Sequence, residues 1–121
     1  MKLITKELLE RIPPLYSQEN EEDPLVVCKF FTPGGSWTWF VIEGSTREKD
    51  GCGFGVECNH RPLSEYDPKR DDILFFGYVD GFEPEIGYFT LSELNGRGVL
   101  GLPVERDLYF DPCRLSAVKK R

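Results

Sequence analysis

The stretch LVVCKFFTPGGSWTWFVIE, residues 25–43, decides the fold that we expect for this chain. Two runs rich in β-branched and aromatic residues flank the tetrapeptide Pro-Gly-Gly-Ser at positions 33–36, and this pattern predicts an antiparallel hairpin. Because side chains alternate along a strand, Trp37, Trp39 and Val41 share one face of the second run. The alternate positions are largely apolar as well. We therefore expect a central strand that is covered on both sides.

A second hairpin is predicted further along the chain. The run ILFFGYV, residues 73–79, resumes the strand pattern, and the Asp-Gly pair at positions 80–81 is a common turn signal. The next strand is expected within FEPEIGYFTL, residues 82–91. Pro84 has no amide hydrogen to donate to a neighbouring strand, so this strand is expected at an edge of the sheet.

Short helices are expected at both ends of the chain. The segment ITKELLERI, residues 4–12, has apolar residues four positions apart, and the two prolines that follow it end the helix. Asp111 followed by proline predicts a C-terminal helix, and Thr90 with Glu93 forms a capping box for a helix of one or two turns. The sequence thus predicts an α+β fold, a single domain over residues 1–121 with an antiparallel sheet of about four strands.

Two segments differ from these regular runs. YSQENEEDP, residues 16–24, is expected to be an acidic, solvated connector. Residues 45–72 are charged, rich in glycine and proline and without a sustained hydrophobic period, which predicts a long insertion loop.

The insertion loop contains Cys52, Cys58 and the single histidine of the chain, His60. Thiolates and a neutral imidazole are ligands that zinc prefers, so zinc is the one cofactor that we consider. The fourth ligand would come from Cys113, Asp50 or Asp67. The spacing is looser than in structural zinc motifs, and a plain surface loop or a reactive Cys–His pair are the alternatives.

The composition excludes several classes of function. The chain has 15 basic and 21 acidic residues among 121, which gives a formal charge of −6. This charge repels phosphate backbones at long range, so we do not expect the bulk surface to bind double-stranded nucleic acid.

The N-terminus lacks the uninterrupted apolar run of a signal peptide or membrane span. We expect a cytoplasmic protein with reduced cysteines and no membrane association.

Two carboxylates flank Pro84. In an extended strand, Glu83 and Glu85 would project the same way, as paired carboxylates do in acid–base chemistry. Acidic residues on an edge strand more often discourage aggregation. We therefore identify no catalytic residue here.

The segment ERD places Arg106 between Glu105 and Asp107. Arg106 is expected to pair with a carboxylate and to pin the last segment to the sheet. Contact with a partner is the alternative.

Trp37 and Trp39 could stack on single-stranded bases, but core packing or a protein interface suits them better in an acidic chain.

Four stretches of the chain resemble one family of small bacterial and phage proteins. They are ITKELLERIPPLYSQE (4–19), KFFTPGGSWTWF (29–40), FFGYVDGFEPEIGYFTLSEL (75–94) and GLPVERDLYF (101–110). The family is Domain of Unknown Function 2958, and the resemblance covers nearly the whole chain apart from residues 45–72. It implies a genomic setting on plasmids, integrative elements and phages, beside genes for DNA handling and antirestriction. It implies no catalytic residue.

The resemblance also implies characteristic positions, which are Trp37, Trp39, Gly77, Gly87, Tyr88, Phe89 and residues 103–107. Combined with the charge pattern, these positions give a set of candidate residues for contact with a partner. The candidates are Trp37, Trp39, Glu43, Glu83, Glu85, Tyr88, Glu105, Arg106 and Asp107.

We expect an accessory protein of a mobile genetic element or phage that is not an enzyme and that binds another protein, in an anti-defence or antirestriction role. The first alternative is a module associated with nucleic acid that uses the aromatic sheet, a zinc site in the loop and the basic tail at residues 119–121. The second is a hydrolase built around Glu83, Glu85 or His60.

Overall fold

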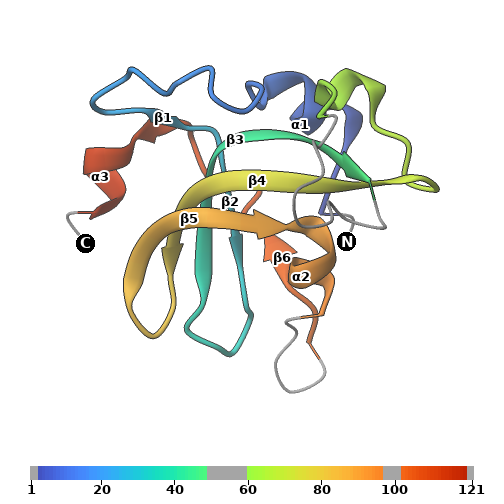
Figure 1. The fold of residues 1–121 in the computed structure, drawn as a ribbon. Coiled ribbons are helices and arrows are strands. Elements are labelled where there is room, and N and C mark those ends of the chain that lie inside the picture. The colour runs from blue at the N-terminus through green and yellow to red at the C-terminus, as the bar shows by residue number, and fades with distance from the viewer. Residues whose placement is uncertain (1–2, 49–59, 97–101, 120–121) are drawn as a thin grey trace.

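The longest strand of the protein is β3 (Thr38–Glu48), the second half of the first hairpin. The structure is a computed structural model that describes residues 3–48, 60–96 and 102–119. Among these residues, β3 is the middle strand of a five-stranded antiparallel sheet in the order β5-β4-β3-β2-β6 (Figure 1). Its neighbours are β2 (Cys28–Phe31) and β4 (Asp71–Asp80). The α+β prediction is confirmed, and this sheet has five strands where about four were expected.

The remaining elements are short. They are β1 (Leu25–Val26), β5 (Pro84–Thr90), β6 (Glu105–Arg106), β7 (Cys113–Arg114), α1 (Lys6–Arg11), α2 (Leu91–Asn95), α3 (Leu115–Lys119) and the 3-10 helix η1 (Leu63–Glu65). β1 and β7 form a separate two-stranded sheet. Thr5 caps α1 and Thr90 caps α2, each by accepting a hydrogen bond from a backbone amide of the first turn. No helix in the described ranges is long and apolar enough to cross a membrane.

The turn between β2 and β3 follows from its local sequence. The Thr32 amide donates to the Trp37 carbonyl at 3.0 Å, and the Thr32 hydroxyl accepts a hydrogen bond from the Trp37 amide at 3.1 Å. Gly34 has a positive φ of 73°, which glycine adopts without steric cost. The expected hairpin is confirmed, since β2 pairs antiparallel with β3 along its whole length.

A β-bulge interrupts the pairing of β3 with β4. Val41 pairs with Gly77, the register then shifts before Glu43, and Ile42 is the extra residue. At the bulge the two strands come very close. A Cβ built on Gly77 would lie only 1.9 Å from the carbonyl oxygen of Phe40. Glycine is the residue that fits this approach.

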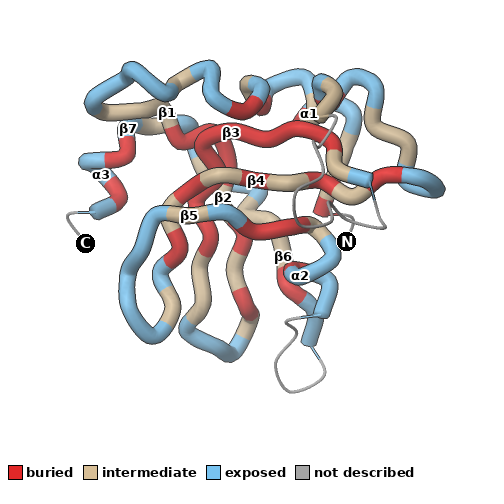
Figure 2. The backbone as a smooth tube through the Cα atoms, in the orientation of Figure 1, coloured by how far each residue is buried: buried red, intermediate tan, exposed pale blue. Residues whose placement is uncertain are grey.

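Both faces of β3 are covered, and Figure 2 shows the strand buried along most of its length. On one face, which we call the α1 face, Trp39 and Phe75 belong to a core cluster with residues of α1, η1 and α2. On the other, the α3 face, Phe40 and Ile42 pack with Leu115 of α3. The expectation of a central, doubly covered strand is therefore confirmed.

The sheet extends into the segment predicted as the insertion loop, residues 45–72. Residues 45–48 continue β3, and residues 71–72 begin β4. The expected limits are therefore too wide at both ends. Polar residues gave these stretches a loop-like composition, although Thr46 and Asp71 are buried in the fold.

Candidate functional site

A groove on the α3 face lies between the connector of residues 16–24 and the strands β4 and β5. It encloses about 400 Å³. Its lining includes Tyr16 of the connector, Phe76 of β4, and Ile86 and Tyr88 of β5. Tyr16 is 56% exposed, Ile86 47% and Tyr88 53%. Three large, half-exposed side chains therefore meet in one hollow, which is typical of a binding surface.

The connector is held over the sheet by Glu43, which comes from the bulge in β3. The Glu43 side chain is buried, and its two oxygens accept hydrogen bonds from the amides of Tyr16 at 2.9 Å and Gln18 at 2.6 Å. A buried carboxylate is stable only when such donors surround it. Tyr16 has a φ of 71°, the left-handed conformation that is uncommon for a residue other than glycine. The turn that builds the groove is thus fixed by the side chain beneath it.

Two further side chains, those of Ser45 and Gln18, fix the same part of the chain. The Leu15 amide donates to the Ser45 hydroxyl at 3.1 Å. The Gln18 side chain accepts from the Leu25 amide at 2.8 Å and donates to the Leu25 carbonyl at 3.0 Å and to the Ile42 carbonyl at 3.2 Å. The connector is therefore an ordered wall of the groove, and its glutamates stay exposed to solvent as the sequence predicts.

Tyr88 lies in a negative environment. Partial burial, a hydrogen bond with the Tyr16 side chain and the nearby charges of Glu43 and Glu19 raise the pKa of the Tyr88 hydroxyl. Burial is the largest of these causes, and the charges of the two glutamates add to it because negative charge disfavours the phenolate. The phenol stays neutral at physiological pH.

Acidic residues form the rim of the groove. Glu19, Glu21 and Glu22 line it from the connector, and all three are exposed. Lys119 of α3 is a basic lining residue, and its ammonium lies 5.7 Å from the ring centroid of Tyr78. This distance is within the range of a cation–π contact. The site combines exposed aromatic surface with an excess of negative charge.

A larger hollow on the α1 face, about 540 Å³, lies between α1 and η1. Its apolar lining includes Ile4, Leu9 and Tyr66, which are partly buried and packed against the main core. It offers no large exposed apolar side chain among the described residues. The groove on the α3 face is therefore the better candidate.

The two tryptophans have different positions. Trp39 is only 4% exposed and belongs to the core on the α1 face. Trp37 is half-buried, stacks on Trp39 with ring centroids 5.8 Å apart, and meets Phe82 edge-on at 5.4 Å. A Cβ on Gly81 would lie 2.3 Å from the Trp37 ring. Core packing accounts for Trp39, and Trp37 braces the hairpin of β4 and β5.

The ERD segment pins the chain to the sheet, but not through the residue that we expected. β6 pairs with the free side of β2, and the ion pair is formed by Lys29 and Asp107 at 3.7 Å. Arg106 instead donates to the hydroxyl of Thr5 at 3.2 Å. Glu105 is half-buried in β6. These residues lie outside the lining of the groove.

Glu83 and Glu85 are exposed in and beside the start of β5. Glu85 pairs across the sheet with Val79. Neither glutamate lines the groove.

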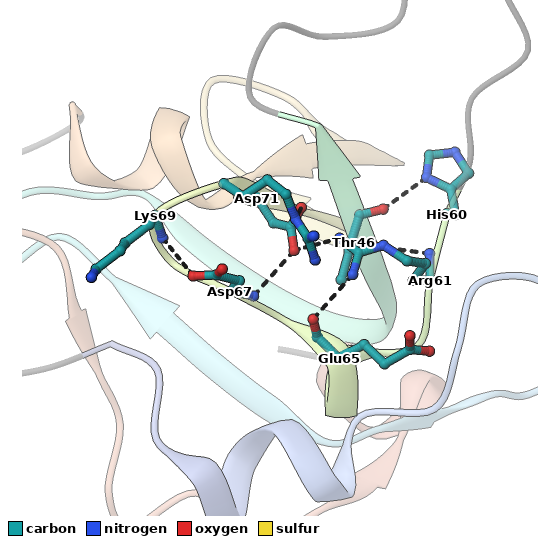
Figure 3. A network of polar contacts seen from close by, with 8 residues as sticks. Thr46, His60, Arg61, Glu65, Asp67, Lys69 and Asp71 are labelled. Atoms are coloured by element: carbon teal, nitrogen blue, oxygen red, sulfur yellow. Dashed lines mark hydrogen bonds and ion pairs between the residues drawn. The ribbon is translucent and has the colours of Figure 1, made fainter.

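Figure 3 shows the polar network that connects β3 with the segment before β4. The His60 Nδ1 lies 2.9 Å from the Thr46 carbonyl oxygen, and it must donate because that oxygen can only accept. The side chain of Asp71 is fully buried and pairs with Arg61 at 2.5 Å. The Asp67 amide also donates to Asp71, at 3.1 Å. The network has the features of a structural clamp.

The predicted zinc site falls mainly outside the described residues, because Cys52 and Cys58 do so. Asp50 lies there as well. Within the described ranges there is no group of three or more His, Cys, Asp or Glu side chains that could hold a metal ion. The zinc site therefore stays a prediction.

Cys28 is a buried thiol, and we expect it to resist alkylation in the folded protein. Burial raises the pKa of Cys28 to about 12, against the opposing influence of Arg106 and Arg11. The reactive thiolate is therefore scarce at neutral pH. Iodoacetamide treatment at pH 8 followed by peptide mass mapping should find Cys28 modified only in urea, whereas the half-buried Cys113 reacts without denaturant. Rapid labelling of Cys28 in native buffer would contradict this burial.

The sequence missed most of the groove. Of the candidate contact residues, only Glu43 and Tyr88 line it, and Glu43 is engaged by the amides of the chain itself. Tyr16 and the glutamates beside it belonged to the segment expected to be solvated. One available signal was the carboxylate of Glu43 directly after the apolar run TWFVI of the central strand, because a buried charge requires donors from elsewhere in the fold.

The fold and the groove define a small α+β domain whose sheet carries an acidic, aromatic hollow. Residues 62–119 match the family model described as "Protein of unknown function (DUF2958)". The match confirms, over this part of the chain, the family resemblance that the sequence indicates. It includes residues 62–72, which the resemblance had left outside the family pattern. No curated protein and no solved structure matches the chain.

Proposed function

We propose that this protein is a non-enzymatic accessory protein that acts by binding another protein, and that the groove on the α3 face is its binding site. The observation that carries the proposal is the clustering of Tyr16, Ile86 and Tyr88, all about half exposed, in one hollow. Exposed aromatic side chains on rigid elements supply most of the binding energy in many protein interfaces.

The groove is also held in shape before any partner binds. Glu43 fixes the turn at Tyr16, and Gln18 ties the connector to β1 and β3. A preformed site loses less conformational entropy on binding than a flexible one. This rigidity favours a specific partner over transient, non-selective contact.

The biological setting of the proposal comes from the family resemblance. The resemblance implies relatives on plasmids, integrative elements and phages, beside antirestriction genes. We therefore infer that the partner is a host defence protein in the cytoplasm.

The test compares two tyrosine truncations. We expect Tyr88→Ala to weaken capture of a host defence protein roughly thirtyfold, since truncation of an interface hot spot costs 2 kcal/mol or more. Tyr109→Ala is the matched control, because Tyr109 is 94% exposed and lies outside the groove. Capture from host lysate, followed by titration of the recovered partner with each variant, measures the effect. Circular dichroism verifies that both variants fold.

The control also discriminates between two surfaces. Tyr109 lies beside Leu108 in a second hollow of about 280 Å³ next to β6. A partner that is lost with Tyr109→Ala and retained by Tyr88→Ala would place binding at that second hollow and contradict the groove. A partner that is indifferent to both changes would contradict the groove as well.

A further inference from the structure

Among the described residues, the outer edge of β5 is open. β5 is the terminal strand of the sheet, and no described residue pairs with its outer side. Such an edge presents unpaired amides and carbonyls to an incoming strand. Natural edge strands are usually protected by proline or by charged side chains. Here Pro84 and Glu85 protect only the first two residues, and residues 86–90 carry no charge and no proline.

The same strand supplies the apolar lining of the groove. Ile86 and Tyr88 project from β5 onto the α3 face, where they pair across the sheet with Tyr78 and Phe76. A segment added beside β5 would therefore place alternate side chains next to Ile86 and Tyr88. Open edge and groove form one continuous surface.

Gly87 lies between these two residues and has no internal explanation. Gly77 is constrained by the Phe40 carbonyl, but nothing lies within 4 Å of a Cβ built on Gly87. Because side chains alternate along a strand, this open space lies on the α1 face, opposite Ile86 and Tyr88. Gly87 therefore adds no side chain that would cover the edge of β5 from that face.

The charge of the groove selects the partner's side chains. Glu19, Glu21 and Glu22 outnumber Lys119 along the lining. Lys119 itself lies against the ring of Tyr78, so this face already holds one cation next to an aromatic ring. Arginine and lysine satisfy both features of the groove, because each is attracted by carboxylates and by aromatic faces.

We propose that the partner contributes an extended segment that pairs with the outer edge of β5 and places an arginine or lysine side chain in the groove. This inference rests on the proposed function and names the chemical class of the partner. Main-chain hydrogen bonds along β5 supply affinity, and the basic side chain supplies selectivity. A second copy of this acidic chain is the poorer occupant, because the acidic rims of two copies would repel each other.

The first experiment tests the charge. The probe is a pool of ten-residue peptides in which valine, isoleucine or threonine alternates with arginine, lysine, serine or glutamate. Immobilised protein should enrich the peptides rich in arginine and lysine. The triple variant Glu19→Gln, Glu21→Gln, Glu22→Gln should retain them about tenfold less, as expected for the loss of three exposed charge pairs. The matched control is Glu7→Gln, Glu10→Gln, Glu65→Gln, which removes three exposed glutamates on the α1 side and should bind as the wild type does.

The second experiment tests strand pairing. Amide hydrogen exchange is followed by NMR at residues 86–90 with an enriched peptide at ten times its Kd. Amides of β5 that exchange fast in the free protein should slow about tenfold, while those already bonded to β4 change little. Binding without this protection would overturn pairing with the edge. Enrichment of neutral or acidic peptides, or of none, would overturn the basic segment.

The remaining outcomes are equally decisive. Sedimentation of the free protein as a dimer with protected β5 amides would assign the edge to a second copy and overturn the proposal. A partner that depends on Tyr88, found together with a failed peptide experiment, would leave the proposed function standing and remove only this inference. Absence of any partner that depends on Tyr88 would remove the proposed function itself.

Discussion

Gly77→Ala is expected to lower the free energy of unfolding by about 3 kcal/mol, at the upper end of the usual cost of overpacking. The new Cβ would lie 1.9 Å from the carbonyl oxygen of Phe40 and 3.0 Å from its carbonyl carbon. These atoms are main chain in the middle of the sheet, so no side chain can rotate away to make room. β3 or β4 must shift, and the pairing beside the bulge weakens. Urea denaturation followed by circular dichroism measures the change.

Gly87→Ala is the matched control for this variant. Gly87 pairs with Gly77 across β4 and β5, yet a Cβ there meets nothing within 4 Å. Alanine also restricts the unfolded chain, so we expect stability to stay unchanged or to rise by up to about 1 kcal/mol. Equal losses in the two variants would show that the approach to Phe40 is not the constraint at Gly77.

The same glycine shows where sequence reasoning ends. The run ILFFGYV is sufficient to predict a strand, because its apolar and aromatic residues favour a pleated, buried surface. The need for glycine at position 77 depends on a bulge in a different strand, and that bulge is a property of the register between β3 and β4. A nonlocal register leaves no local sign in the sequence.

The central strand was predictable because its signal is local. Alternation in TWFVI gives two apolar faces, and the structure covers both of them. The helix starts at Thr5 and Thr90 were predictable for the same reason, since a capping threonine and the amide that it accepts from lie three residues apart. Each of these features is decided within one short stretch of chain.

The groove was not predictable because it joins residues that are distant in sequence. Glu43 accepts from the amides of Tyr16 and Gln18, which lie 27 and 25 residues before it. A polar connector without hydrophobic period gives no sign that it will be held against a sheet. The carboxylate in the strand indicates that donors are needed, but the sequence does not show which segment supplies them.

Asp71→Asn is the second variant with a large expected effect, a loss of about 3 kcal/mol in the free energy of unfolding. The carboxylate is fully buried, pairs with Arg61 at 2.5 Å and accepts from Arg70 at 3.3 Å. The Asp67 amide donates to it as well, at 3.1 Å. Asparagine keeps the shape but leaves Arg61 without its counter-charge. Because the Arg61 side chain is 24% exposed, water compensates part of the lost interaction. We therefore expect a loss of stability at the lower end of the range usual for removing one partner of a buried ion pair.

Asp111→Asn makes the same chemical change at an exposed position and serves as the control. Surface substitutions of this kind usually change stability by no more than about 0.5 kcal/mol. The two variants are compared with the wild type by urea denaturation at pH 7. A loss for Asp71→Asn no larger than that for Asp111→Asn would contradict a stabilising role for the buried ion pair.

The pH dependence of the Asp71→Asn effect identifies its cause. Burial raises the pKa of Asp71, but the hydrogen bonds from the Asp67 amide, Arg61 and Arg70 outweigh burial and hold that pKa below its ordinary value of 3.8. Between the folded and the unfolded pKa, the unfolded chain binds the proton and the folded chain does not. The stability that Asp71 contributes is therefore fully present above about pH 4 and is lost as the pH falls through the lowered pKa. The difference between wild type and Asp71→Asn should be the same at pH 7 and pH 5 and should narrow at pH 3. A difference that stays constant down to pH 3 would show that Asp71 acts through its shape and not through its charge.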